Sequence, residues 1–175
     1  ELLPTRIRRP AHLFGQAGDE IRNDFNTLTK GRTSQQLPES NTLIGDPENL
    51  FIEEGAEIEA AILNVKTGPI YIGKNAKILE GAMLRGPVSL GEAAIIKMGA
   101  KIYGPSSFGP QCKVGGENNN VTFQGNSNKV MQPLDSGVIL EQIQMHLTLR
   151  TTTPKLRSGL IPKDVSPKPD LHFMA

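Results

Sequence analysis

Three cationic side chains in the middle of the chain, Arg85, Lys97 and Lys113, have the chemistry to bind a phosphate group. Guanidinium and ammonium groups donate charge-assisted hydrogen bonds to phosphate oxygens, and these are among the stronger hydrogen bonds in proteins. Each cation lies next to a large apolar residue that is expected to point inward, so the three charged side chains are expected to point outward. Taken singly, each is better explained as ordinary surface charge.

Groups that could move a proton or hold a metal are scarce. Histidine, the commonest general base near neutral pH, occurs at His12, His146 and His172 and nowhere in residues 40–129. The acidic run in residues 53–59 has no histidine or cysteine pair beside it, so it is expected to be a solvated face and not a metal site. The glycines are spaced for chain bends and do not form a nucleotide-binding loop. The sequence predicts no metal.

The elements that must position these residues follow a six-residue period. Large apolar side chains recur without a miss at Ile72, Ile78, Leu84, Leu90, Ile96, Ile102, Phe108 and Val114. Small residues come four positions after most of them, at Ala76, Ala82, Ala94, Ala100 and Cys112. This period predicts an all-β, hexapeptide-repeat solenoid (a parallel β-helix) over residues 40–129, with the large side chains stacked inside.

One turn of such a coil takes about 18 residues. Inward stacks are therefore expected for two sets of three residues: Ile72, Leu90 and Phe108, and Ile78, Ile96 and Val114. Ile52 and Ile58 look like earlier members, and two extra residues before Ile72 predict a small loop near residues 64–68. Glycine directly follows four of the large residues and is expected to supply bend angles that other residues avoid. These are Gly73, Gly91, Gly109 and Gly115.

Composition agrees with one domain that is neither membrane-embedded nor nucleic-acid binding. The chain has 175 residues, a formal net charge of +1 and no tryptophan. The basic patch Arg6, Arg8, Arg9 is too short for a nucleic-acid stripe. No apolar run is long enough to cross a bilayer, no secretory leader is recognisable, and Cys112 is the single cysteine. A cytoplasmic location is therefore predicted.

The two flanks differ from the repeats. Residues 1–39 are expected to be a helical connector from an upstream domain, with a short helix capped by Asp19 and closed by Lys30 and Gly31. Its buried face would hold Ile21, Phe25 and Leu28. Residues 130–175 lose the six-residue phase and carry several prolines, so an irregular or disordered tail is expected there.

Segments inside and outside the repeats together resemble one family. They read LPTRIRRPAHLF, TKGRTSQ, FIEEGAEIEAAILNVKTGPIYIG, EGAMLRGP, GAKIYGPSSFGPQCKVGGE and GNSNK. Over about residues 3–129 the chain resembles the C-terminal half of sugar nucleotidylyltransferase-like proteins, related to the bifunctional glucosamine-1-phosphate acetyltransferase and N-acetylglucosamine-1-phosphate uridylyltransferase. The resemblance implies an upstream nucleotidyltransferase domain, a left-handed β-helix and a homotrimer. It also implies a coenzyme A thioester as co-substrate and a sugar phosphate or nucleotide sugar as ligand.

The resemblance places the acyl-acceptor groove close to residues 117–129. The candidate substrate- or coenzyme-binding residues there are Glu117, Asn119, Asn126 and Lys129, in addition to the three cations. For the run Asn118 to Asn120 two interpretations are open, a stacked asparagine ladder or a position near the groove, and the ladder is favoured.

The departure from the family directly after Lys129 suggests a hypothesis about the tail. Family members continue with Gly-His and later with a Gly-Ala-Asp-Thr-Asn segment. When Glu141 to Pro154 are written in permitted codons behind one extra G, the same bases read Gly-Ala-Asp-Thr-Asn-Ala-Ser-Asn-Leu-Lys-Asn-Asn-Tyr-Ala. The tail is therefore interpreted as an out-of-frame translation that has removed the family's catalytic-position histidine.

Three functions remain open at this stage. The first is a β-helix of the coenzyme A-dependent acyltransferase type in a sugar-1-phosphate nucleotidylyltransferase-like protein, expected to be inactive in this chain because residues 40–129 lack a histidine. The second is a noncatalytic trimerisation scaffold for the missing nucleotidyltransferase domain. The third is a structural solenoid unrelated to sugars, which fits the repeats but not the connector motifs.

Overall fold

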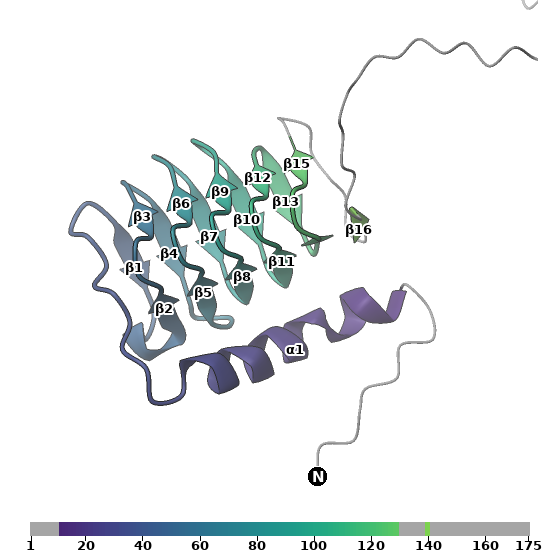
Figure 1. The fold of residues 1–175 in the computed structure, drawn as a ribbon, viewed down its shortest axis with the longest axis horizontal. Helices are drawn as coiled ribbons and strands as arrows, with labels where there is room; N and C mark the ends of the chain where they lie inside the picture. The colour runs from purple at the N-terminus through teal and green to yellow at the C-terminus, as the bar shows by residue number, and fades with distance from the viewer. Residues whose placement is uncertain (1–10, 130–138, 141–175) are drawn as a thin grey trace, which may run out of the picture. The chain divides into compact units, whose positions relative to one another are not determined.

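The computed structural model describes residues 11–129 and 139–140, all within one unit comprising residues 1–144. One helix, α1 (Ala11–Thr29), precedes a left-handed parallel β-helix whose successive coils stack side by side (Figure 1). The predicted fold class is confirmed. Most of the predicted tail lies outside the described residues, and its two described residues form a strand.

Each coil contributes one short strand to each of three parallel sheets. Sheet A contains β1 (Thr42–Ile44), β4 (Ile62–Asn64), β7 (Met83–Arg85), β10 (Lys101–Tyr103) and β13 (Glu117–Asn119). Sheet B contains β2 (Leu50–Ile52), β5 (Ile70–Ile72), β8 (Val88–Leu90), β11 (Ser106–Phe108), β14 (Thr122–Phe123) and β16 (Ile139–Leu140). Sheet C contains β3 (Glu57–Ile58), β6 (Lys77–Ile78), β9 (Ile95–Ile96), β12 (Lys113–Val114) and β15 (Asn128–Lys129). A 3-10 turn, η1 (Pro47–Asn49), links β1 to β2.

The predicted inward stacks are present. In sheet B, Ile72 pairs with Leu90 and Leu90 with Phe108, so each residue lies one coil from the next. The second set, Ile78, Ile96 and Val114, pairs in the same way in sheet C. All eight large repeat residues are at most 1% exposed. Burial of these side chains is the main source of stability in a coil that has little other core.

Coil length changes along the solenoid. The first coils are longer than the middle ones, since Leu50 pairs with Ile70 whereas Ile70 pairs with Val88. The additional residues form the loop 65–69, in agreement with the predicted bulge. The middle coils keep the three-hexapeptide period. Beyond them the coils are shorter, because Lys101 pairs with Glu117 and Lys113 with Asn128.

The glycines that follow the large residues have a different role from the one predicted. Gly73, Gly91 and Gly109 do not have a positive φ. They form a column at one corner, and a Cβ on Gly91 would lie 2.6 Å from the nitrogen of Pro110. Close stacking of backbone on backbone therefore requires glycine there. The left-handed angles fall two residues later, as at Asn75 (φ 55°) and Ala93 (φ 54°).

The N-terminal helix is longer than predicted. It begins at Ala11, so Asp19 is not its cap but a mid-helix residue that pairs with Arg22 one turn on. Ile21 and Phe25 are buried as expected, whereas Leu28 is 48% exposed. The helix ends near Gly31, whose φ of 72° is left-handed. Figure 1 shows α1 lying along sheet B, across the direction of its strands.

Candidate functional site

A groove of about 500 Å³ lies at the corner where sheet A passes into sheet B, beside α1. Its polar lining comes from five side chains on three kinds of element: Arg22 of α1, Thr67 of the loop 65–69, and Arg85, Glu117 and Asn119 of sheet A. The ring of Tyr103 and the backbone near Gly86 and Gly104 complete the wall. The groove brings together three of the predicted site residues.

Sheet register explains this convergence. Arg85, Tyr103 and Asn119 are direct partners at the ends of β7, β10 and β13, so their side chains leave the same face of sheet A in a row. Neighbouring strands are about 4.8 Å apart, which places adjacent side chains within reach of one small ligand. Tyr103 is 38% exposed, and Arg85, Glu117 and Asn119 are exposed as well.

The two arginines of the groove differ in their partners. Arg22 donates to the carboxylate of Asp19 at 3.3 Å and to the carbonyl of Thr67 at 3.1 Å, which ties α1 to the loop. The guanidinium of Arg85 has neither a hydrogen bond nor an ion pair to any described residue. An arginine without a partner beside a second guanidinium is suited to an anion, and Glu117 and Asn119 could accept hydrogen bonds from the same ligand.

The structure separates the other predicted cations from this groove. Lys113 lies on the outer face of sheet C, between Ile95 and Asn128 in the register. The carbon atoms of the Lys97 side chain cover Gly115. Asn126 occupies a corner with a φ of 61°, beside Pro110, to whose carbonyl its backbone amide donates. All three residues precede or follow inward residues, but on other sides of the coil.

Lys129 points into the last described coil. Its side-chain nitrogen donates to the carbonyl of Glu117 at 2.6 Å and to Oδ1 of Asn118 at 2.9 Å, and the residue is only 7% exposed. Burial lowers the pKa of the Lys129 ammonium, and the nearby Glu117 carboxylate opposes this shift. Lys129 thus holds the inside of the coil together where the sequence suggested a ligand contact.

The predicted asparagine ladder is wrong. Asn118 pairs with Ile102, not with another asparagine, and it is fully buried inside the coil. Its side-chain amide donates to the carbonyls of Gly115 and Gly116. Asn119 points outward into the groove, and Asn120 has the left-handed φ of a corner residue, 51°. Three consecutive asparagines therefore have three different surroundings, because side chains alternate along a strand that then turns.

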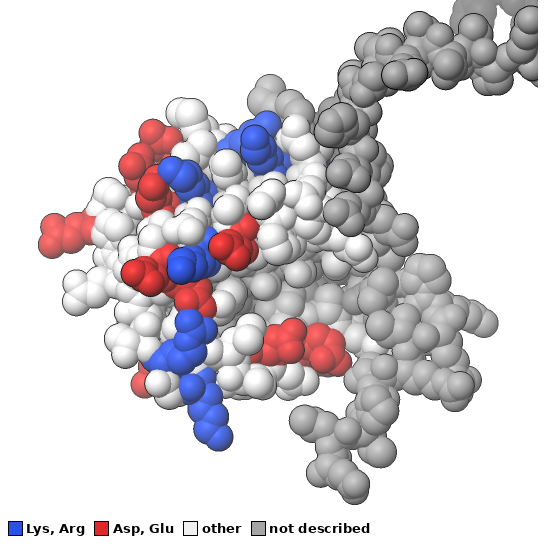
Figure 2. Space-filling model, viewed as in Figure 1, with Lys and Arg blue, Asp and Glu red and all other residues white. Residues whose placement is uncertain are grey.

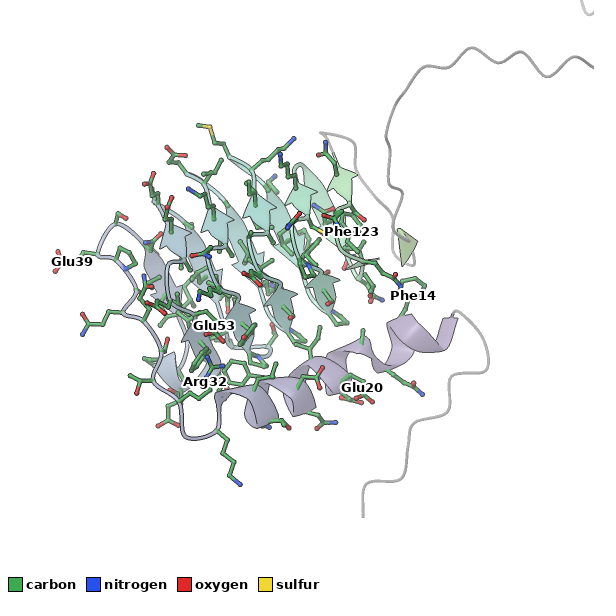
Figure 3. The ribbon with its side chains drawn as sticks, viewed as in Figure 1. Phe14, Glu20, Arg32, Glu39, Glu53 and Phe123 are labelled. Carbon is green, nitrogen blue, oxygen red and sulfur yellow. The ribbon has the colours of Figure 1, made fainter. Side chains whose placement is uncertain are left out.

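A second cluster, which the sequence interpretation missed, fixes the connector to the first coils. Arg32 donates two hydrogen bonds to the carboxylate of Glu53, at 2.7 and 2.6 Å (Figure 3). The guanidinium of Arg32 also lies over the ring of Phe51. Tyr71 donates to the same carboxylate and stacks on Phe51. The hydrogen bonds from Arg32 hold the pKa of Glu53 below its usual value, and burial raises the pKa of Tyr71. The sequence carried one indication of this cluster. Phe51 and Tyr71 are aromatic residues at outward positions of sheet B, each between two inward residues.

Charged side chains of both signs are interspersed over the face seen in Figure 2. Within residues 11–129 and 139–140, no three histidine, cysteine or acidic side chains are grouped so that they could hold a metal ion. Over the same residues, no helix has the length and apolar character of a membrane span.

Comparison with known proteins adds no relative: no protein-family model, curated protein or solved structure matches this chain.

Proposed function

We propose that this solenoid is a noncatalytic scaffold that holds three copies of the protein together through the outer face of sheet A. The observation that carries this proposal is a group of four apolar side chains on that face, Ile44, Ile62, Met83 and Tyr103, around a hollow of about 190 Å³. Asn64, Arg85 and Lys101 line the same hollow. Met83 is 47% exposed, although a large apolar side chain is stabilised by burial. Exposed apolar side chains grouped on one face typically mark a contact surface.

The other two sides of the coil are less suited to self-association. Sheet B has α1 lying along it, in contact with β11. Sheet C presents charged side chains, among them Lys77 and Glu57 paired at 2.7 Å, and Lys113. Sheet A is thus the side on which another coil could bury apolar area. By the resemblance, its partners are two further copies, and each copy carries a nucleotidyltransferase domain upstream. A cytoplasmic setting is part of this proposal, and the single buried cysteine, Cys112, is compatible with it.

Light scattering on the full chain tests the scaffold. The parent chain should have three times its 19.0 kDa mass at micromolar concentration. Ile62→Glu combined with Met83→Glu should produce monomers, because the new carboxylates would have to be buried at the contact. Lys113→Glu changes a charge on sheet C and should leave the trimer intact. A parent chain that is monomeric at this concentration would refute the proposal.

A second candidate function, of the acyltransferase type, rests on the groove at Arg85. There the phosphate of a sugar phosphate would be bound by Arg85 and Arg22, while sugar hydroxyls would bond Glu117 and Asn119. Transfer from a coenzyme A thioester needs a group that accepts the proton of the acceptor amine or hydroxyl. Residues 40–129 contain no histidine for this step, so binding without turnover is the expected behaviour.

Isothermal titration with glucosamine 1-phosphate tests the groove. Arg85→Ala should weaken binding about tenfold or more, which corresponds to about 1.4 kcal/mol for one charge-assisted contact. Lys113→Ala is the matched control and should bind as the parent does. A thiol-release assay with acetyl coenzyme A should stay at background. Equal binding by Arg85→Ala and the parent would exclude this site.

A further inference from the structure

The N-terminal end of the coil is covered by a short polar segment, residues 34–41, that precedes β1. The backbone amide of Gln35 donates to the carbonyl of Ile52 at 2.8 Å, and the hydroxyl of Ser34 accepts from the amide of Ile52 at 2.9 Å. Ile52 ends β2, the first strand of sheet B. Both backbone groups of Ile52 that face away from the next coil are therefore satisfied.

Two side-chain amides continue this pattern around the end. Gln35 accepts from the amide of Gly55 at 3.2 Å and donates to the carbonyl of Ala56 at 3.1 Å. Asn41 donates to the carbonyl of Ile58 and accepts from the amide of Ala61, both at 2.8 Å. A primary amide can make both kinds of bond because it carries a carbonyl oxygen and an NH₂ group.

These bonds reproduce the ladder found between complete coils. One coil further on, the carbonyl of Glu54 accepts from the amide of Asn75, and the amide of Glu57 donates to the carbonyl of Ala76. In the register of sheet C, Gly55 and Ala56 are the counterparts of Asn75 and Ala76 in the preceding coil. The side chain of Gln35 thus occupies the place of the peptide groups that a further coil at this end would have supplied.

We propose that residues 34–41 are an amide cap, which closes the N-terminal end of the solenoid to strand addition by a second copy of the chain. Open strand edges pair readily with other chains, and two identical ends can pair with each other about a two-fold axis. Here the edges of β2 and β3 are already bonded to the cap, and β1 is only three residues long. Leu37 and Leu43 pack against the core at the same end. Contacts between copies through this end of the coil are thereby prevented.

The test removes the side-chain amides of Gln35 and Asn41 and uses a fluorescent label to detect contact between the capped ends of two chains. Glu39 points away from the coil at the capped end (Figure 3), so Glu39→Cys labelled with pyrene gives excimer emission only when two such ends come together. In this background Gln35→Ala with Asn41→Ala should raise excimer emission at 50 µM about tenfold over the parent. The matched control is Gln36→Ala with Asn23→Ala. It also removes one glutamine amide and one asparagine amide, but at exposed positions that take no part in the cap bonds.

Circular dichroism verifies that each variant retains the β signal of the parent. If the double variant loses it, Gln35→Ala alone is measured, since Asn41 still holds the edge of β3. All these measurements are made in the Ile62→Glu, Met83→Glu background, because a lateral trimer would place the labelled ends of its copies side by side. In that background a folded Gln35→Ala or double variant with no more excimer than the control overturns the cap, and so does strong excimer emission without the cap substitutions. Failure of the lateral trimer leaves this result unaffected, because the background removes any contact through sheet A.

Discussion

The middle coils and the last described coil are built from the same kind of register but filled with different chemistry. Between residues 70 and 114 the large inward repeat residues are all apolar, and each of them up to Ile96 pairs with its counterpart three hexapeptides on. The next coil is shorter, Asn118 follows Ile102 in its stack, and Lys129 follows Val114. The pairing of the strands therefore persists although the interior becomes polar.

The difference shows that a polar interior is possible when its members satisfy one another. Asn118 bonds two carbonyls and also accepts from Lys129, so neither of these buried polar side chains lacks a partner. Buried polar groups are tolerated on this condition. The interior of the middle coils is stabilised by the volume of single apolar side chains, whereas that of the last coil is stabilised by the hydrogen-bonded pair Asn118 and Lys129.

The largest expected effect is in the middle coils. Leu84→Ala should lower the free energy of unfolding by about 2–5 kcal/mol, because it leaves a cavity in an interior where Leu84 is 1% exposed. Urea unfolding followed by circular dichroism measures this loss. The neighbouring Met83→Ala, on the outer face, should cost far less in a chain kept monomeric by dilution. Similar losses at both positions would contradict the filled interior.

A smaller effect is expected at the glycine column. Gly91→Ala should destabilise by about 1–3 kcal/mol, since the added methyl group meets backbone atoms of the next coil that cannot move independently. The control is Gly15→Ala in α1, where a Cβ has no neighbour within 4 Å. That substitution should be neutral or stabilise the helix by up to about 1 kcal/mol. The free energies of unfolding of Gly91→Ala and Gly15→Ala are measured by the same urea titration.

The coupled pair gives a sharper test of the comparison. Lys129→Met should cost about 1 kcal/mol, because the lost hydrogen bonds are partly offset by removal of a buried charge. Adding Asn118→Leu should recover much of this loss, so the two substitutions should not be additive in a double-mutant cycle. Additive losses would mean that the two side chains act independently.

The smallest effect concerns pH. Burial lowers the pKa of Lys129 from the ordinary lysine value of 10.5, so the unfolded chain binds more protons than the folded chain between the two pKa values. Stability from this residue should therefore rise as pH increases through that window towards 10.5, and it should be least favourable below the folded pKa. In thermal melts from pH 8 to 10.5, the melting temperature of the parent should rise relative to that of Lys129→Met. A constant difference would contradict the shift.

Periodicity was sufficient to predict the middle of the fold. A large residue every six positions determines which side chains point inward, and this made the stacks from Ile52 to Val114 predictable. It was insufficient where the period changes. The ladder prediction failed because Asn118 stacks on Ile102 and its two neighbours point elsewhere. The helix start was misplaced because aspartate often caps a helix, although Phe14 and Ala17 continue the helical spacing of Ile21 and Phe25 before Asp19.

The candidate site was predictable only in part. Phase along the chain indicates whether a side chain points outward, but not on which of three faces it lies. Arg85, Glu117 and Asn119 meet on sheet A, whereas Lys113 and Asn126 are elsewhere. Arg22 reaches the groove from a helix that is far away in the sequence, and no spacing rule connects it with Arg85.

The helix along sheet B also has a consequence for how this protein can change its length. Residues 73–90 are one coil, and a chain without them would place Gly91 directly after Ile72 with every side chain in phase. Yet α1 and the residues directly after it contact the stack on both sides of that interval. Arg32, three residues beyond the helix, binds Glu53, and Gly18 of the helix lies near Pro105. Removing one coil would bring these attachments about 4.8 Å closer, nearly the pitch of about 5.4 Å of a helical turn. A coil gained or lost would therefore require α1 to be about one turn longer or shorter if both contacts are to be kept.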